Sequence, residues 1–263
     1  MATLEEGFEF TGSLGRYSAY RMKGSDKIVI RKKGGPSKKK IKTSPRFERL
    51  RENMEEFKGV GKASRAVIWS VAPVKHLASP RLSGDLSSVF KKIQDLDPQS
   101  GRGERNIYLS QHRFMLAGFQ LNKKHPFQAV VTGPLGCTFH RETKSAVVQL
   151  PGLVKGINLL LPWKHPVYRF SISLAVISDL ILEKGNYNDY GHEWDRTDLY
   201  TEWQVANEPF QPQTYELKLK DPGAIKDTQS LVLSIGIEMG TISAYGDIGF
   251  VKGAGAACIL AVG

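Results

Sequence analysis

Residues 167–176 read Val-Tyr-Arg-Phe-Ser-Ile-Ser-Leu-Ala-Val, and a large apolar side chain occupies every second position from 168 onward. The same period of two returns in residues 231–237, which read Leu-Val-Leu-Ser-Ile-Gly-Ile. This alternation is typical of a β-strand that has one face on a hydrophobic core. The two stretches therefore predict two strands in the C-terminal half of the chain.

Further strand candidates surround these two stretches. Clusters of Gly, Pro, Asn and Asp separate the candidates, and no helical period lies between them. Seven or more strands without an intervening helix indicate an antiparallel β-sandwich or jelly-roll-like body, which we assign to residues 107–263. The polar residues 183–207 are expected to form a surface loop. The additional strand candidates are residues 112–121, 127–131, 146–150, 215–219 and 257–262.

The N-terminal residues predict a smaller element of a different kind. Residues 7–33 combine alternating apolar positions with glycine turns, which predicts a short β-meander. Residues 34–42 have no apolar periodicity and cannot build a core, so we expect a loop or flexible arm that only a partner would order. Residues 1–43 are thus predicted to be a basic β-meander with a flexible arm.

A helical segment is predicted over residues 44–98. Ser44 is a good N-cap and Pro45 suits the first helical position. An apolar stripe follows at helical spacing, and Gly59 and Gly61 are expected to end that helix. A second helix over 62–70 and a third after Pro80 complete about three helices, and residues 99–103 are interpreted as a linker. The stripe of the first helix consists of Phe47, Leu50, Met54 and Phe57; that of the third consists of Leu82, Leu86, Val89, Phe90 and Ile93.

The fold class expected from these patterns is mainly β with an α-helical N-terminal part.

The charge of the chain is very unevenly distributed. Residues 1–105 contain 23 Lys or Arg and 12 Asp or Glu, which accounts for the whole net charge of +11. The remaining residues carry equal numbers of both signs. A basic arm beside a neutral body indicates a chain that binds a polyanion with one part and packs or self-associates with the other.

The basic residues at the start of the chain are the candidate binding site. Residues 16–65 hold 17 Lys or Arg against five Asp or Glu. Such a cluster favours salt-dependent, sequence-independent contact with nucleic acid phosphates, and Tyr17, Tyr20 and Phe47 are near enough in sequence to stack on bases. The alternatives are a solvated surface and docking of an acidic protein partner. The candidate residues are Arg31, Lys32, Lys33, Lys38, Lys39, Lys40, Lys42, Arg46 and Arg49.

Residues 45–57, Pro-Arg-Phe-Glu-Arg-Leu-Arg-Glu-Asn-Met-Glu-Glu-Phe, followed by Gly61-Lys62-Ala63, resemble a segment of a family of uncharacterised bacterial proteins from Bacteroidetes-type genomes. The similarity extends upstream to Gly12, Gly15, Tyr20 and residues 31–35, and weakly to residues 100–105. It covers about the N-terminal 40% of the chain. It implies a bacterial or phage origin and a shared two-part layout, and it implies no activity.

Catalytic motifs are not evident. The stretch Gly59-Val-Gly-Lys-Ala-Ser64 lacks the first glycine of a phosphate-binding loop, because Glu56 stands at that position. No histidine has metal-ligand spacing, so no metal and no cofactor are expected. Cys137 and Cys258 are expected to be buried thiols. The weakest alternative is an enzyme that uses the loop 189–195, which contains His192 and Glu193.

The cellular setting follows from what the sequence lacks. No stretch approaches the ~20 apolar residues of a membrane span, and the N-terminus does not resemble a secretory signal. We therefore expect a cytoplasmic protein, or one within a phage-like or nucleoprotein particle, and no membrane partner. The combined prediction is a non-enzymatic structural protein with a coat-like layout: a basic part that binds nucleic acid and a β-sandwich body that forms a homo-oligomer.

Overall fold

The two alternating stretches form neighbouring strands at the centre of the fold. The computed structural model describes residues 2–3, 10–22, 25–189, 195–221 and 223–263. Strand β7 (Val167–Ser178) pairs antiparallel with β13 (Gln229–Ile242). On the far sides lie β10 (Arg196–Tyr200), paired with β7, and β14 (Ile248–Val262), paired with β13. We call this sheet, of order β10-β7-β13-β14 with β11 (Gln204–Val205) also paired to β7, the central sheet.

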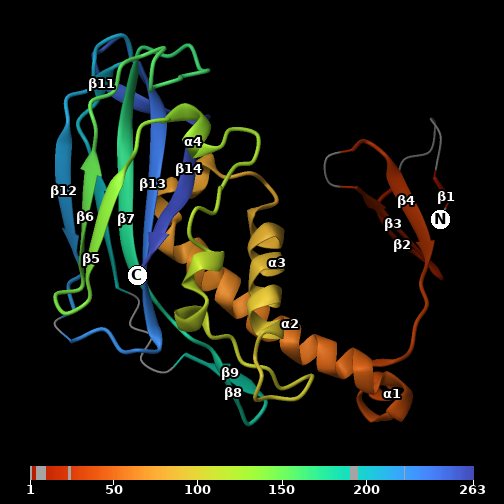
Figure 1. Ribbon diagram of the computed structural model, residues 1–263. Helices are drawn as coiled ribbons and strands as arrows, with labels where there is room; N and C mark the ends of the chain where they lie inside the picture. The colour runs from red at the N-terminus through yellow and green to blue at the C-terminus, as the bar shows by residue number, and fades with distance from the viewer. Residues whose placement is uncertain (1, 4–9, 23–24, 190–194, 222) are drawn as a thin grey trace. The chain divides into compact units, whose positions relative to one another are not determined.

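A second, three-stranded sheet covers one face of the central sheet. This outer sheet has the order β12 (Gln213–Lys218), β6 (Ser145–Leu150), β5 (Gly136–His140), and all its pairs are antiparallel. Phe170, Ile172 and Leu174 of β7 share one buried cluster with Val148 of β6 and Leu217 of β12. The predicted mainly β fold class is confirmed, and its body is sandwich-like, as Figure 1 shows.

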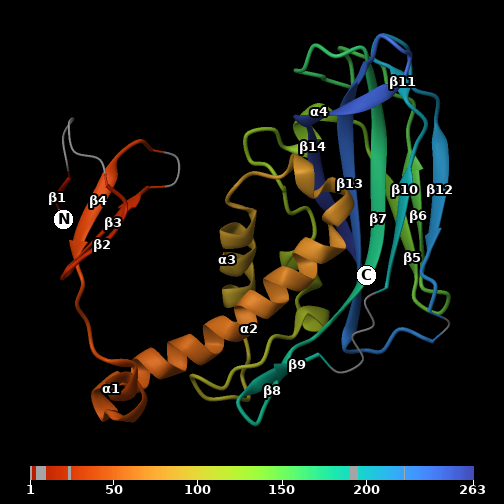
Figure 2. The ribbon, with the colours of Figure 1, turned by 180° about the vertical axis from the view of Figure 1, so that it is seen from behind.

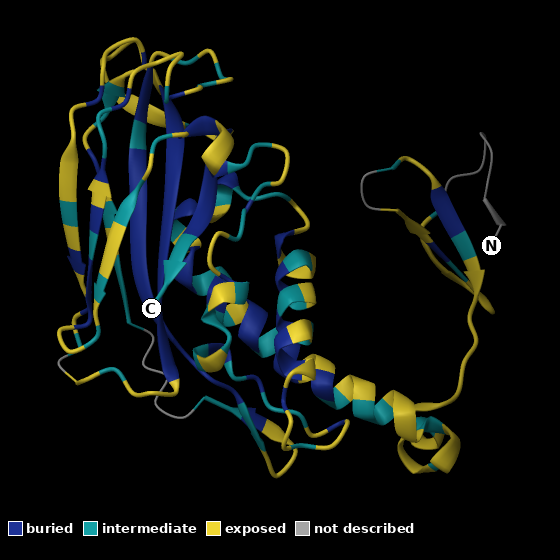
Figure 3. Cartoon of the chain, in the orientation of Figure 1, coloured by how far each residue is buried: buried dark blue, intermediate teal, exposed yellow. Residues whose placement is uncertain are grey.

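Helices cover the other face of the central sheet. That face carries the small residues between the large ones, among them Ser171, Ser173, Ser234 and Gly236, and they are buried. Figures 2 and 3 show the helices on this side and the buried central strands between the two layers. A Cβ on Gly236 would lie 2.8 Å from Cγ1 of Val74, so only the smallest residue fits there. The alternation in β7 and β13 therefore separates a large-residue face from a small-residue face, and both faces are buried.

The covering layer consists of α2 (Glu48–Ser70), the 3-10 segment η2 (Ala72–Leu77) and α3 (Leu82–Asp95). The predicted third helix is confirmed with its apolar face. The predicted break at Gly59 and Gly61 is wrong, because α2 is continuous through both. Gly59 has a packing role instead: the ring of Tyr187 lies against its Cα, and an added Cβ would be 2.5 Å from Tyr187 Cζ.

We expect Gly59→Ala to destabilise the protein by about 2 kcal/mol, the usual scale for overpacking, although alanine favours a helix. The Tyr187 ring cannot move freely: its hydroxyl donates to Arg105 O at 2.8 Å and accepts from Gln94 Nε2 at 2.8 Å. Gly61→Ala is the matched control, because nothing lies within 4 Å of its added Cβ. This control should gain about 1 kcal/mol from helix propensity. Urea unfolding of both variants measures the difference, and equal effects would contradict the packing role of Gly59.

The apolar stripe predicted at the start of α2 is not covered in the structure. Leu50, Met54 and Phe57 are 40%, 50% and 62% exposed. The buried side of α2 begins at Glu56 and continues through Val60, Ala63 and Val67, where the helix reaches the small-residue face of the central sheet. The helix predicted from the spacing of this stretch is confirmed.

Two strand assignments and one loop assignment were wrong. Residues 112–121 form the 3-10 turn η4 (Arg113–Met115) and an irregular segment with one bridge, Gln120 to Cys258. Residues 127–131 contain the helical turn α4 (Phe127–Val130), in which Phe127, Val130 and Val131 bury the i, i+3, i+4 side. The predicted loop 183–207 contains β10, β11 and the hairpin β8 (Ile181–Glu183) and β9 (Asn186–Asn188). β10 is an edge strand, which explains why its sequence is largely polar.

The chain separates into two compact units, residues 1–51 and 52–263, which we call the basic unit and the body. The predicted linker 99–103 lies within the body, where the amide of Gly103 donates to Glu56 Oε1 at 2.8 Å. The predicted helical segment does not stand apart from the β-sandwich, because α2 and α3 share a buried cluster with Val232 and Ile259 of the central sheet. The division into units falls inside α2.

Candidate nucleic-acid interface

The basic unit is built on a small antiparallel sheet. Its order is β1 (Ala2–Thr3), β4 (Ile28–Lys32), β3 (Tyr17–Arg21), β2 (Gly12–Leu14), which agrees with the predicted meander. Ala19, Ile28 and Val29 are buried and form its small interior. Two helical elements follow, α1 (Lys38–Thr43) and the 3-10 turn η1 (Pro45–Phe47). The predicted flexible arm is thus wrong for residues 38–42, which are helical.

The structure places all nine candidate residues in the basic unit, and all are exposed. Arg31 and Lys32 end β4 and Lys33 follows it. The four lysines 38, 39, 40 and 42 belong to α1, Arg46 belongs to η1, and Arg49 lies in the first turn of α2. Among the described residues, no carboxylate lies within ion-pair distance of the α1 lysines, Lys32, Lys33 or Arg46. These cations are available to an external anion.

Helix α1 concentrates charge at a cost to its own stability. It has six residues, none of them buried, and Lys38 and Lys42 lie one turn apart. Like charges at this spacing destabilise a helix, and so short a helix is marginal alone. Ser37 caps it by accepting from Lys40 N, and the Arg51 guanidinium donates to Ile41 O at 2.8 Å and Ser44 O at 2.9 Å. These contacts hold the lysines on a defined scaffold.

Exposed aromatic rings lie beside the cations on the small sheet. Tyr17 pairs across the strands with Lys32, and both are exposed. Arg31 Cζ lies 5.5 Å from the ring centre of Tyr20, which is 42% exposed. Phe47, the third aromatic candidate, is half-buried. Exposed rings next to exposed cations are the combination that single-stranded nucleic acid binders use for stacking and phosphate contact.

The units differ sharply in charge. Residues 1–51 contain 14 Lys or Arg and 5 Asp or Glu, a net charge of +9, which leaves +2 for the body. Of the two acidic residues described in the basic unit, Asp26 is 3.6 Å from Arg21 and Glu48 begins α2. Such a density of positive charge attracts polyanions without sequence preference.

The candidate catalytic loop 189–195 is described only at its two ends. His192, Glu193 and Trp194 lie outside the described residues. At the ends of that loop, Asp189 accepts from Lys62 Nζ at 2.8 Å and Asp195 accepts from the amide of Asp221 at 2.9 Å. In the described ranges, no three His, Cys, Asp or Glu residues form a metal-binding group. No helix among these residues is both long and apolar enough to cross a membrane.

The segment 59–64 that resembles a phosphate loop lies in the middle of α2, so its amides are not free to bind phosphate. Of the two cysteines, Cys258 is buried, and burial raises the pKa of its thiol to about 12. Cys137 on β5 is exposed, so the prediction that it is buried was wrong.

An exposed apolar hairpin in the body was missed by the sequence analysis. Beyond Gly240, β13 pairs only with β14 within the described part of the chain, and residues 241–250 are all exposed. Ile242 pairs with Ile248 on the face that also carries Phe250, and Tyr245 at the turn is 95% exposed. We call residues 241–250 the hairpin tip. The turn residues Gly246 and Asp247 between two apolar strands were the available signal.

The fold and the exposed cations of the basic unit define a class of protein: a mainly β body joined to a strongly basic unit. Comparison with known proteins adds no more particular identification. No protein-family model, no curated protein and no solved structure matches the chain. The resemblance to the Bacteroidetes-type bacterial family therefore stays a prediction.

Proposed function

We propose that this chain is a non-enzymatic structural protein of a nucleoprotein assembly. Its basic unit binds nucleic acid through phosphates, without sequence specificity, and its body self-associates. This layout resembles that of coat proteins in which a basic segment precedes a β-sandwich, and the comparison is one of layout alone. The protein would act in the cytoplasm or within a phage-like or nucleoprotein particle.

The observation that carries this proposal is the charge of the basic unit. It collects a net charge of +9 in 51 residues, with four exposed lysines on one short helix and no described carboxylate paired to them. Each phosphate bound by such a lysine releases condensed counterions, which supplies most of the free energy of non-specific binding. The exposed tyrosines beside Arg31 and Lys32 add stacking surfaces.

The hairpin tip supports the second half of the proposal. Contiguous exposed apolar residues on a soluble protein commonly mark a contact with another protein. Ile242, Ile248 and Phe250 share one face of the hairpin, and among the described residues β13 beyond Gly240 pairs with no strand other than β14. A second copy of the chain would bury this face.

The experiment is size-exclusion chromatography with light scattering, with and without nuclease, at low and high salt. We expect a large particle that contains nucleic acid, loses 260 nm absorbance after nuclease or high salt, and becomes smaller. In the double variant Ile242→Asp/Tyr245→Asp, the particle should dissociate into a smaller species. Phe114→Asp is the control, because Phe114 is equally apolar, 74% exposed and outside the hairpin.

Two outcomes would contradict the proposal. A monomer without nucleic acid under all conditions would contradict both nucleic-acid binding by the basic unit and self-association of the body. A particle whose size does not change with nuclease or salt would still support self-association of the body. It would contradict nucleic-acid binding and favour an acidic protein partner for the basic unit.

A further inference from the structure

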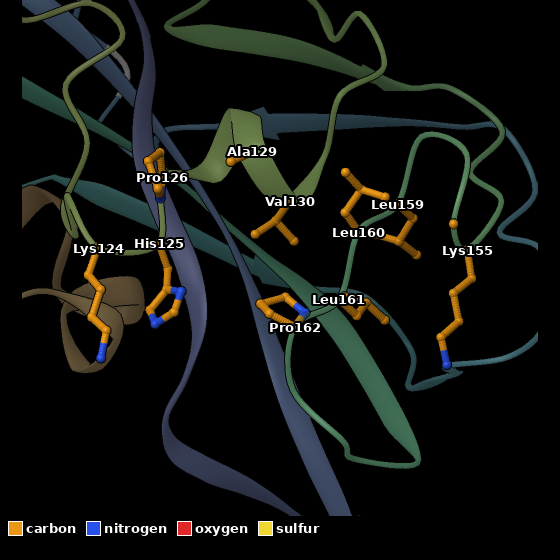
Figure 4. Close-up of a pocket in the computed structure, with 11 residues that line it drawn as sticks. Lys124, His125, Pro126, Ala129, Val130, Lys155, Leu159, Leu160, Leu161 and Pro162 are labelled. Atoms are coloured by element: carbon orange, nitrogen blue, oxygen red, sulfur yellow. The ribbon is translucent and has the colours of Figure 1, made fainter.

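A pocket in the body combines an apolar floor with a basic rim. It has a volume of about 440 Å³, within the usual range for small-molecule sites. α4 forms one wall and the segment 155–162 the other, as Figure 4 shows. The apolar lining consists of Pro126, Ala129, Val130, Leu159, Leu160, Leu161 and Pro162.

The two walls are joined by backbone contacts, so the pocket is preformed. The amide of Leu160 donates to Val130 O at 2.7 Å, and the amide of Thr132 donates to Asn158 O at 3.0 Å. Val130 and Leu159 are buried and anchor the floor in the core between the sheets. A preformed apolar cavity of this kind loses little conformational entropy when a ligand enters it.

The titratable side chains around the pocket are two lysines and a histidine. Lys124 and His125 lie on one side and Lys155 on the other (Figure 4), and no acidic residue lines the pocket. Asn207 Oδ1 accepts from Lys155 Nζ at 2.6 Å, which fixes that ammonium group. The His125 ring packs against Trp163 with ring centres 5.2 Å apart. Lys124 has no ion-pair partner among the described residues.

We propose that this pocket binds a small amphipathic carboxylate, with an aliphatic chain in the apolar floor and its anionic head at Lys124, on the rim. The apolar lining excludes a strongly polar metabolite, since such a ligand would leave its polar groups without partners. Two ammonium groups with no guanidinium suit a single carboxylate better than a phosphate cluster, which favours the arginine fork. This site goes beyond the proposed function, and all its residues belong to the body.

The test is isothermal titration calorimetry of the full chain with hexanoate, octanoate and decanoate, and with 1-octanol as the uncharged probe. We expect the affinity to rise about fourfold for each added methylene until the pocket is filled. Octanoate should bind several-fold more tightly than 1-octanol. The fluorescence of Trp163, whose ring packs against that of the lining residue His125, should change on binding, and Trp163→Phe should remove that change.

Three variants complete the test. Ala129→Trp should fill the pocket and abolish binding while leaving the unfolding transition in place, because Ala129 is exposed. Lys124→Ala should weaken octanoate about two- to fivefold, the range for one exposed ion pair. Lys164→Ala is the control, since Lys164 is exposed and does not line the pocket. The proposal is overturned if octanoate does not bind, if it binds Ala129→Trp unchanged, or if 1-octanol binds equally well.

Discussion

Replacing Lys38, Lys39, Lys40 and Lys42 by glutamine should lower the affinity of the protein for single-stranded DNA or RNA at least ~100-fold at ~50 mM salt. All four side chains are exposed on α1, and no described carboxylate competes for them. On a single strand, each phosphate contact contributes about 0.7 to the slope of log affinity against log salt, so the loss of four contacts should make that slope shallower by about 2.8. Fluorescence anisotropy with a labelled oligonucleotide measures both quantities.

A matched control separates local charge from net charge. Replacing the four exposed body lysines Lys164, Lys218, Lys220 and Lys252 by glutamine changes the net charge equally. We expect this control to bind nearly as well as the unmodified protein and to keep its salt slope. If both quadruple variants lost affinity equally, binding would reflect total charge and the basic unit would not be the site. If the α1 variant kept its affinity, α1 would not contact phosphate.

Much of the body could be predicted from the sequence because strand periodicity reports one buried face directly. β7 and β13 carry large residues at alternate positions along most of their length, and both were found. The burial of the intervening serines could not be predicted, because a serine at the surface and a serine under a helix look alike. Ser173 Oγ, for example, donates to Ser70 O at 3.0 Å, a contact between residues 103 positions apart.

The failures have similar physical causes. Residues 127–131 were read as a strand because a short apolar run fits either a strand or one helical turn. Gly59 was predicted to end a helix because helix propensity depends only on neighbouring residues. The ring of Tyr187, which packs against Gly59, belongs to a hairpin that is distant in sequence. The candidate cations could be located in sequence because charge density needs no tertiary information. The pocket could not, since its walls come from residues 124–130 and 155–162.

A buried ion cluster that joins the helical layer to the central sheet carries the last prediction. Glu238 on β13 is 1% exposed. Its Oε1 accepts from Arg169 Nε at 2.5 Å and from Ser171 Oγ at 3.2 Å, and its Oε2 lies 2.7 Å from His76 Nε2. The guanidinium carbon of Arg169 also contacts two aromatic rings and is 4.6 Å from the centre of each. Those rings belong to Tyr200 and Trp203.

We expect Glu238→Ala to destabilise the protein by about 3–5 kcal/mol, because removing one partner leaves a partly buried guanidinium without its carboxylate. Glu216→Ala is the control. Glu216 is also on a strand, β12, but it is exposed, so its loss should stay within about 0.5 kcal/mol. Denaturant unfolding of both variants gives the comparison. Equal, small effects would show that the cluster contributes nothing to the free energy of unfolding.

The same cluster should make stability depend on pH in a defined direction. Burial alone would raise the pKa of Glu238, but the contacts with His76 and Arg169 outweigh it and hold the pKa below its usual value of 4.5. A carboxylate with a lowered folded-state pKa contributes its full stabilisation above the unfolded-state pKa, and the contribution is lost as the pH falls through the folded-state pKa. The unmodified protein should therefore lose more stability than Glu238→Gln on acidification below 4.5. Parallel pH profiles for the two proteins would show that Glu238 does not supply this dependence, and a steeper profile for the variant would reverse the sign of its role.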